Sequence, residues 1–321
     1  MKNPVAIIVG GTGQFGLTTA KYLLKKNYKI IITSRSKKKI KNLKNLKGKF
    51  IFYCLDIKNK NKIKKMLQKF LPNEIYYFAG QSSVSKSFFL KKETLISNYN
   101  GCKNFLDTLV EQKSTCKFLN ASSCEIYGNS KNIKISSKKK PVSPYGEAKL
   151  KSFNIVKKYR TKYNLRAYNA VIFNTESYLR MRNFLIPKIC LAAINASKLN
   201  KKTTFGNLNI SREWNWCDEQ VKFLNLFLSK KPQDFILSNG KEYSATQMLN
   251  FAFKYFQLDY KKFILTSKKF MRRKDIQNKS SFWKECLNRN KIIRKPSIYG
   301  KILIIKLIKF YLNEKKYKYT A

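Results

Sequence analysis

The chain has 321 residues, of which 43% are hydrophobic and 14% aromatic, and this is enough for one large domain or two modest ones. It contains no histidine, which excludes Ser-His-Asp catalysis and histidine metal ligands. The seven cysteines form no C-x-x-C pair, so we expect free thiols, no metal site and a cytoplasmic location.

The net charge is +51, from 68 basic and 17 acidic residues. The lysines are spread over the whole chain among many asparagines and isoleucines, which is the pattern that an AT-rich coding bias produces. We therefore predict no specific nucleic-acid partner, although so many charges bind polyanions nonspecifically at low salt. No apolar run is long enough for membrane insertion. Segment 298–312 has the character of a membrane-surface helix, and we favour a terminal helix that covers the core.

Strands and helices alternate along the first part of the chain. Residues 4–9 are an apolar run that stops at glycines, which is typical of a first strand and not of a signal peptide. Further strands are predicted at 29–36, 49–56, 74–80, 116–123 and 166–174, and helices at 17–26, 61–71, 95–111 and 145–163. This alternation predicts an α/β fold of the Rossmann type, with a doubly wound parallel sheet.

Beyond Asn174 the alternation fades, and helices such as 187–196 and 218–228 mix with short strands. We therefore predict an NADP-binding Rossmann domain over residues 1–174. A smaller α/β substrate-binding domain is predicted over residues 175–321, with segments that can interleave between the two.

The first predicted strand runs into the sequence GGTGQFG, which opens a helix. Its glycines have the spacing G-x-x-G-x-x-G. In this context they let the backbone approach a pyrophosphate, and the helix N-terminus favours the negative charge. The predicted phosphate-binding turn consists of Gly10, Gly11, Thr12, Gly13, Gln14, Phe15 and Gly16.

The end of the second strand indicates which dinucleotide binds. NAD-binding proteins usually place a carboxylate there for the ribose 2′-hydroxyl. Residues 33–36 are Thr-Ser-Arg-Ser, without an acid, and Arg35 with its neighbouring hydroxyls suits a 2′-phosphate. We therefore predict NADP as the cofactor. Asp56 and Ile57, at the end of the third strand, are predicted to meet the adenine.

Tyr145 and Lys149 lie four residues apart in VSPYGEAKLK, on one face of a predicted helix. An ammonium there is expected to lower the pKa of the tyrosine and make it a usable general base. Ser123 and Glu125, in ASSCEIYG, follow a strand and should face the same crevice. These four residues are the predicted catalytic set. The plainer alternatives are a surface pair that occurs by chance and a carboxylate that caps a turn.

A strand-end serine with a helix-borne tyrosine and lysine resembles the extended, nucleotide-sugar branch of the short-chain dehydrogenase/reductase superfamily. Within that branch, the chain resembles the GDP-mannose 4,6-dehydratase family over nearly its whole length. FNTES and GNLNISREW are the most specific of the matching segments. The full set of matching segments is GGTGQFG, FAGQSSV, ASSCEIYG, SPYGEAKL, FNTES, FGNLNISREW and NGKEYSATQMLNFAF.

The resemblance implies a hydro-lyase that converts GDP-mannose to GDP-4-keto-6-deoxymannose with NADP, in a homodimer or homotetramer. Tyr145 would take the proton of the sugar 4-hydroxyl, helped by Lys149 and Ser123. Glu125 would remove the C5 proton while the C6 hydroxyl leaves as water. Further cofactor contacts are implied for Ala79, Gly80, Ser82 and Arg180, and substrate contacts for Asn174, Asn183, Lys188, Arg212 and Arg272.

The chain also departs from the family pattern. Thr175 and Trp216 stand where the family has histidines, and Phe15 replaces an acidic residue in the glycine turn. The segment YLRMRNF, residues 178–184, replaces the family's P-R-R-G-E-N-F loop. These departures leave open another nucleotide-sugar epimerase, reductase or decarboxylase. A further alternative, from another class, is a cofactor-binding scaffold that docks on RNA or membrane through its charge.

Overall fold

The computed structural model describes residues 3–37, 43–44, 46–268, 278–293 and 295–313. Its centre is a seven-stranded parallel sheet with the order β11-β6-β5-β4-β1-β2-β3. The strands are β1 (Val5–Val9), β2 (Lys29–Ser34), β3 (Phe50–Cys54), β4 (Glu74–Tyr77), β5 (Lys117–Ser123), β6 (Ala167–Ile172) and β11 (Asp234–Leu237). The strand order reverses between β1 and β4, so the predicted Rossmann-type fold is confirmed.

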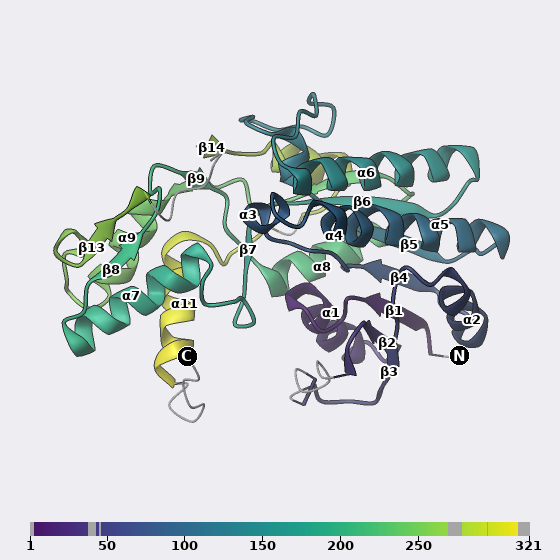
Figure 1. The fold of residues 1–321 in the computed structure, drawn as a ribbon, viewed down its shortest axis with the longest axis horizontal. Coiled ribbons are helices and arrows are strands. Elements are labelled where there is room, and N and C mark those ends of the chain that lie inside the picture. The colour runs from purple at the N-terminus through teal and green to yellow at the C-terminus, as the bar shows by residue number, and fades with distance from the viewer. Residues whose placement is uncertain (1–2, 38–42, 45, 269–277, 294, 314–321) are drawn as a thin grey trace.

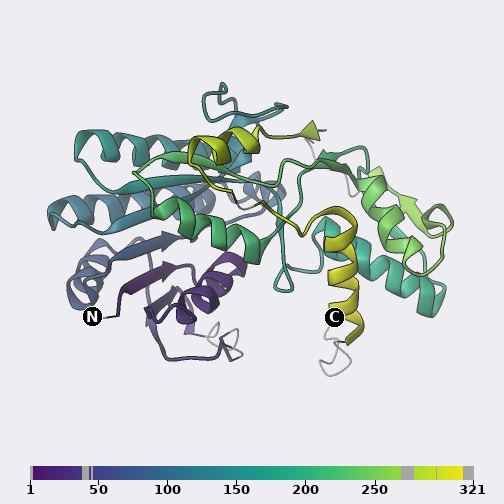
Figure 2. The same ribbon diagram turned by 180° about the vertical axis from the view of Figure 1, so that it is seen from behind.

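Helices cover both faces of this sheet (Figures 1 and 2). Alternate residues of one strand point to opposite faces: Ile8 packs with α1 and α8, and Ile7 packs with α2 and α5. The helices around the sheet are α1 (Gln14–Leu24), α2 (Lys60–Phe70), α3 (Val84–Ser87), α4 (Lys91–Leu95), α5 (Gly101–Glu111), α6 (Pro144–Lys162), α8 (Cys217–Leu228) and α10 (Trp283–Arg289).

A second group of elements lies at one end of the molecule, at the left in Figure 1. Its apolar core packs α7 (Leu185–Leu199), α9 (Ala245–Lys254) and α11 (Gly300–Asn313) together. The predicted terminal helix is confirmed, because Leu303 and Leu307 of α11 are buried in this core. Of the helices in the described segments, none has the length and apolar character that crossing a bilayer requires.

Short strands lie within this second group and between it and the sheet. β7 pairs with β10, β9 pairs with β12 and β14, and β8 pairs with β13. Their bounds are β7 (Thr175–Glu176), β8 (Thr203–Phe205), β9 (Ser211–Arg212), β10 (Asn215–Trp216), β12 (Tyr243–Ser244), β13 (Ile264–Thr266) and β14 (Asn278–Lys279). The chain after Asn174 also returns to the sheet through β11, and the predicted division into two domains stays a prediction.

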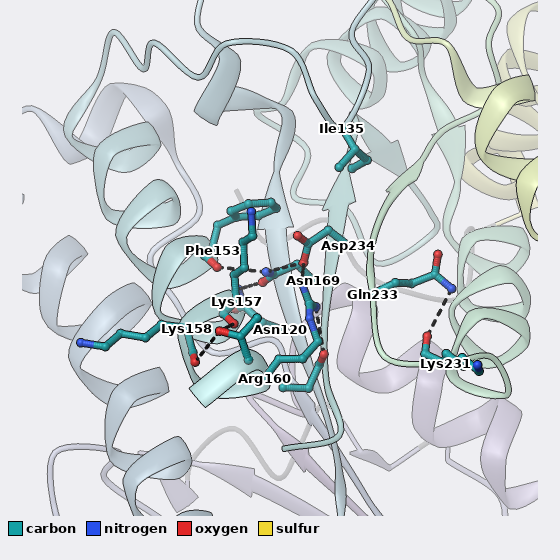
Figure 3. Close-up of polar contacts among 12 residues, drawn as sticks. Asn120, Ile135, Phe153, Lys157, Lys158, Arg160, Asn169, Lys231, Gln233 and Asp234 are labelled. Atoms are coloured by element: carbon teal, nitrogen blue, oxygen red, sulfur yellow. Dashed lines mark hydrogen bonds and ion pairs between the residues drawn. The ribbon is translucent and has the colours of Figure 1, made fainter. Parts of the chain in front are cut away.

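A buried polar cluster joins α6 to three strands, and we call Asn120, Arg160, Asn169 and Asp234 the sheet cluster (Figure 3). Asp234 Oδ1 accepts hydrogen bonds from Arg160 Nη2 at 2.8 Å and from Asn169 Nδ2 at 2.9 Å. Asn169 Oδ1 accepts from Asn120 Nδ2 at 2.9 Å. These bonds fix the register of β5, β6 and β11 and the position of α6.

The predicted helix at 95–111 is interrupted. A π-helical turn, Ile96–Asn100, separates α4 from α5. The turn directs the Asn98 side chain to the carbonyl oxygens of Gln81, at 3.1 Å, and Thr94, at 2.9 Å. Such turns are frequent at functional sites, and this one lies against the cleft described below.

Candidate active site

A cleft of about 680 Å³ lies at the carboxyl ends of the parallel strands. This is where the fold places ligands, because the chain crosses to the other side of the sheet there. The cleft brings most of the predicted site residues together. Those that line it are Gly10, Thr12, Gly13, Gln14, Phe15, Gly16, Arg35, Ile57, Ala79, Gly80, Ser82, Ser123, Glu125, Tyr145, Lys149, Asn174, Arg180, Asn183 and Arg212.

The glycine turn at the start of α1 has no room for larger residues. Gly10 has a left-handed φ of +77°, and an added Cβ would lie 2.8 Å from the backbone of Ala79. A Cβ on Gly16 would overlap the backbone of Gly11. Gly11 is not among the lining residues, and an added Cβ there would meet Ile32. The turn is therefore as tight as a phosphate-binding turn requires.

The N-terminus of α1 opens onto the cleft. Gly13 is its N-cap, and no side chain caps this helix end. The amide groups of the first turn and the helix dipole can therefore bind an anion. Gln14 Nε2 donates to the carbonyl oxygen of Thr175 at 3.0 Å, and the Phe15 ring stacks on Phe78 with 5.5 Å between centroids.

Arg35, directly after β2, lines the part of the cleft that we call the nucleotide end because the predicted cofactor residues lie there. Its Nη2 donates to Glu93 Oε1 at 3.2 Å. Ile57 lines the cleft, but Asp56 is not among the lining residues. The Asp56 carboxylate instead accepts a hydrogen bond from the Lys58 amide at 3.0 Å and lies 3.6 Å from the Lys58 ammonium. An adenine contact of Asp56 stays a prediction.

The predicted catalytic residues begin where β5 runs into a short 3-10 helix, Cys124–Tyr127. Ser123 caps this helix, and its Oγ accepts a hydrogen bond from the Glu125 amide at 3.2 Å. Ser143 caps α6 in the same way, and Pro144 occupies the first turn. A Cβ on Gly146 would lie 2.8 Å from the carbonyl oxygen of Glu125. Gly146 therefore allows α6 to approach Glu125 closely.

Tyr145 and Lys149 are both buried in the wall of the cleft. Lys149 Nζ donates to the carbonyl oxygen of Ala121 at 2.7 Å and lies 5.8 Å from the centroid of the Tyr145 ring. Burial lowers the pKa of Lys149 from 10.5 to about 8. The ammonium is thus held at a fixed place beside the phenol by a backbone carbonyl of β5.

The pKa of Tyr145 differs from the expectation. Burial raises this pKa above its ordinary value. A hydrogen bond to Ser123 and the charge of Arg180 lower it, but by less than burial raises it. The predicted lowering of this pKa is wrong for this structure, because desolvation of the phenolate outweighs the Ser123 hydrogen bond and the charge of Arg180, which are the effects that lower it. The negative charge of Glu125 also raises the pKa of Tyr145, so the two groups interact.

The chain after β6 contributes Asn174, Arg180, Asn183 and Arg212 to the cleft. Lys188 is not among the lining residues, since its Nζ donates to the carbonyl oxygen of Thr204 at 2.6 Å. Arg272 lies outside the described residues. Within the part of the chain that is described, no group of three or more Cys, Asp or Glu residues gathers to hold a metal ion.

The sequence model of the family described as GDP-mannose 4,6 dehydratase matches residues 7–292. The chain belongs to this family. GDP-mannose 4,6 dehydratase from Homo sapiens is 32% identical over 270 residues, which cover 78% of this chain and 71% of that protein. GDP-mannose 4,6-dehydratase from Vibrio cholerae is 30% identical over 264 residues, which cover 78% and 71%. The family consists of dehydratases, so the chain is a member of a hydro-lyase family.

Solved structures share the fold of this family member. The dTDP-glucose 4,6-dehydratase from Bacillus anthracis, in complex with NAD, has a TM-score of 0.84, is 17% identical, and covers 98% of each chain. The UDP-glucose 4-epimerase from Thermotoga maritima, with UDP-glucose, has a TM-score of 0.81 at 17% identity and covers 96% of this chain and 99% of that chain. These likenesses show the fold alone.

Sequence reasoning missed two acidic residues of this GDP-mannose 4,6-dehydratase family member. Glu93 lines the cleft, and only the folded chain places it beside Arg35. Glu176 is buried, and its Oε2 lies 3.7 Å from Arg180 Nε. Burial raises the pKa of Glu176 from 4.5 to about 7, while Arg180 lowers it less. Glu176 belongs to the segment FNTES, so its place in a specific motif was the available signal.

Proposed function

We propose that this protein is an NADP-dependent 4,6-dehydratase of a nucleotide-diphosphate sugar, with GDP-mannose as the favoured substrate. The observation that carries the proposal is that Ser123, Glu125, Tyr145 and Lys149 line one cleft. A reductase or a 4-epimerase needs the serine, tyrosine and lysine. The carboxylate beside them suits removal of the C5 proton, which is the step that dehydration adds.

The residues of the nucleotide end fit a dinucleotide. The uncapped N-terminus of α1 and the narrow glycine turn suit its pyrophosphate, and Arg35 suits a 2′-phosphate. Ile57, Ala79, Gly80 and Ser82 line the same part of the cleft. When bound, NADP⁺ accepts a hydride from the sugar and gives it back, so that it acts as a catalyst.

Tyr145 acts as the general base for the sugar 4-hydroxyl while C4 is oxidised. The raised pKa of its phenol makes it a strong base once ionised, and the positive charge of Arg180 favours that ionised form. The hydrogen bond between Ser123 and Tyr145 orients the phenol and lowers its pKa. The Ala121 carbonyl, at 2.7 Å from Lys149 Nζ, holds the ammonium in place.

Glu125 takes the C5 proton, which the new 4-ketone has made acidic. The same carboxyl group then gives this proton to the C6 hydroxyl, which leaves as water, and the C5=C6 bond forms. The hydride held by a bound cofactor would then be added at C6, and the proton that Tyr145 took from the 4-hydroxyl would be returned to C5, which gives the 4-keto-6-deoxy sugar. Arg212, Asn174 and Asn183 also line the cleft and supply polar groups for the diphosphate and the sugar.

The proposal is tested by product analysis with a panel of nucleotide sugars, GDP-mannose among them, and NADP⁺. We expect a 4-keto-6-deoxy product from GDP-mannose without net accumulation of reduced cofactor. A sugar inverted at C4, or steady accumulation of NADPH, would show that the enzyme is an epimerase or an ordinary dehydrogenase. A homodimer or homotetramer is part of the proposal and is measured by light scattering.

The Glu125→Gln variant tests the step that defines a dehydratase. We expect its dehydration rate to fall by roughly 10²–10⁴-fold, while the first oxidation still produces enzyme-bound reduced nicotinamide. Glu147→Gln is the matched control, because Glu147 is an exposed carboxylate in the first turn of α6. If the Glu125 variant keeps the wild-type dehydration rate, another group removes the C5 proton.

A further inference from the structure

An ion pair stands at the nucleotide end of the cleft. Arg35 follows β2 and Glu93 lies on α4, and the Arg35 Nη2 to Glu93 Oε1 distance is 3.2 Å. Both residues line the cleft. Of the described residues that line it, Glu93 and Glu125 are the two with carboxylates. Glu125 has its place in the chemistry, and Glu93 lies beside the cation that suits a 2′-phosphate.

Hydrogen bonds hold the backbone of Glu93 and of its neighbour in place. Its carbonyl oxygen accepts a hydrogen bond from Ser97 Oγ at 2.8 Å. The next residue, Thr94, is buried, and its Oγ1 accepts from Gln81 Nε2 at 3.1 Å. Helix α4 is thereby tied to the loop after β4, which itself lines the cleft. The carboxylate is therefore held near Arg35 by the fold.

A carboxylate at this place has opposite effects on the two dinucleotides. It partly neutralises Arg35, so a 2′-phosphate must compete for the guanidinium, and the phosphate is also repelled by a like charge. A free ribose 2′-hydroxyl can instead donate a hydrogen bond to a carboxylate, as in NAD-binding proteins that carry an acid at the end of the second strand. Here α4 supplies the acid that the end of β2 lacks.

We propose that Glu93 is a specificity-determining residue that weakens selection for the 2′-phosphate and permits binding of NAD. The proposal rests on the proposed function, because it assumes that a nicotinamide dinucleotide lies in this cleft. Glu93 offsets the preference that Arg35 creates, and the ratio of the two affinities depends on both side chains.

The test measures dissociation constants of NADP⁺ and NAD⁺ by titration calorimetry, without substrate. For Glu93→Gln we expect the preference for NADP⁺ over NAD⁺ to rise roughly tenfold relative to wild type. The rise should shrink at high salt, because the cleft is open to solvent at this end. Glu93→Ala is a second variant with the same expected direction.

Glu111→Gln is the matched control. Glu111 is also a carboxylate in an exposed ion pair, 2.6 Å from Lys60 Nζ, with a side-chain exposure of 46% compared with 43% for Glu93. The substitution removes the same charge from the protein, and Glu111 is not among the residues that line the cleft. The affinity ratio of this variant should therefore stay at the wild-type value.

The Arg35→Gln background shows whether the two side chains act together. There, replacing Glu93 should change the ratio less than in wild type. If the ratio in Glu93→Gln stays within about twofold of the control, or moves toward NAD⁺, the ion pair is a surface pair without a role in selection. If neither dinucleotide binds the wild-type protein, the proposed function itself fails.

Discussion

Two arginine–carboxylate pairs, each largely buried, differ in how completely their hydrogen bonds are made. In the sheet cluster, Arg160 and Asp234 are 2.8 Å apart, and Arg160 Nη1 also donates to the carbonyl oxygen of Ala167 at 3.0 Å. At the cleft, Arg180 and Glu176 are 3.7 Å apart, and within the described residues neither Arg180 Nε nor Glu176 Oε2 makes a hydrogen bond. Both carboxylates are largely buried, with side-chain exposures of 9% and 3%.

The difference shows that burial alone does not make a charged pair structural. A carboxylate that accepts several hydrogen bonds from fixed donors is stabilised in its ionised form, and such a pair holds strands in register. A buried carboxylate whose charged partner is distant keeps a raised pKa, and Glu176 is such a case. Shifted pKa values at the cleft, also seen for Tyr145 and Lys149, are typical of functional sites.

The largest expected effect is on catalysis and concerns the cleft. Tyr145→Phe should lower kcat by roughly 10²–10⁴-fold, because the proposed general base is lost, while the free energy of unfolding changes by only about 1 kcal/mol. The matched control is Tyr127→Phe, which removes a buried hydroxyl that donates to the carbonyl oxygen of Ile135 at 3.2 Å. It should cost similar stability and keep kcat. Equal losses of kcat in both variants would contradict a catalytic role for Tyr145.

The next largest effect concerns the sheet cluster. Asp234→Ala leaves the Arg160 guanidinium buried without its carboxylate, and we expect the free energy of unfolding to fall by about 3–5 kcal/mol. Denaturant unfolding measures this change. Glu111→Ala, which breaks an exposed pair, should cost less than about 1 kcal/mol. If both variants lose the same stability, the sheet cluster does not hold the fold together as its hydrogen bonds indicate.

Much of the fold could be predicted from local patterns. The alternation of apolar strands and helices indicated six strands of the sheet, and GGTGQFG indicated the turn before α1. The seventh strand, β11, is four residues long and follows a stretch in which strands and helices are mixed, so no local signal assigned it to the sheet. Its place depends on contacts such as that of Asp234 with Arg160, which are distant in sequence.

The site was predictable in its residue types and less so in its electrostatics. The spacing of Tyr145 and Lys149 indicated one helix face, but the pKa of the phenol depends on how deeply the folded chain buries it. Arg35 was identified from its position after a strand. The carboxylate of Glu93 reaches it across 58 positions of sequence, and such a contact has no local pattern.

The smallest effect concerns Glu176 and Arg180. The free energy of unfolding should depend on pH through the titration of Glu176. The pKa of Glu176 is about 7 in the folded protein and near its ordinary 4.5 in the unfolded chain. Between these values the folded protein holds the proton more tightly, so its stability falls as pH rises through this range. Glu176→Gln lacks this titration. The variant should therefore gain stability relative to wild type between about pH 4 and about pH 8, by up to about 3 kcal/mol.

Unfolding curves of wild type and Glu176→Gln at several pH values measure this gain. The groups that act on Glu176 limit it: Arg180 favours the carboxylate, and the Cys190 thiol on α7 interacts with it. Glu285→Gln is the control, because Glu285 is an exposed carboxylate, 58% exposed, with a lysine 3.5 Å away. Its stability difference from wild type should stay nearly constant over the same range. A constant difference for Glu176→Gln as well would mean that burial does not raise the pKa of Glu176, and the contrast with the fully hydrogen-bonded pair of the sheet cluster would be lost.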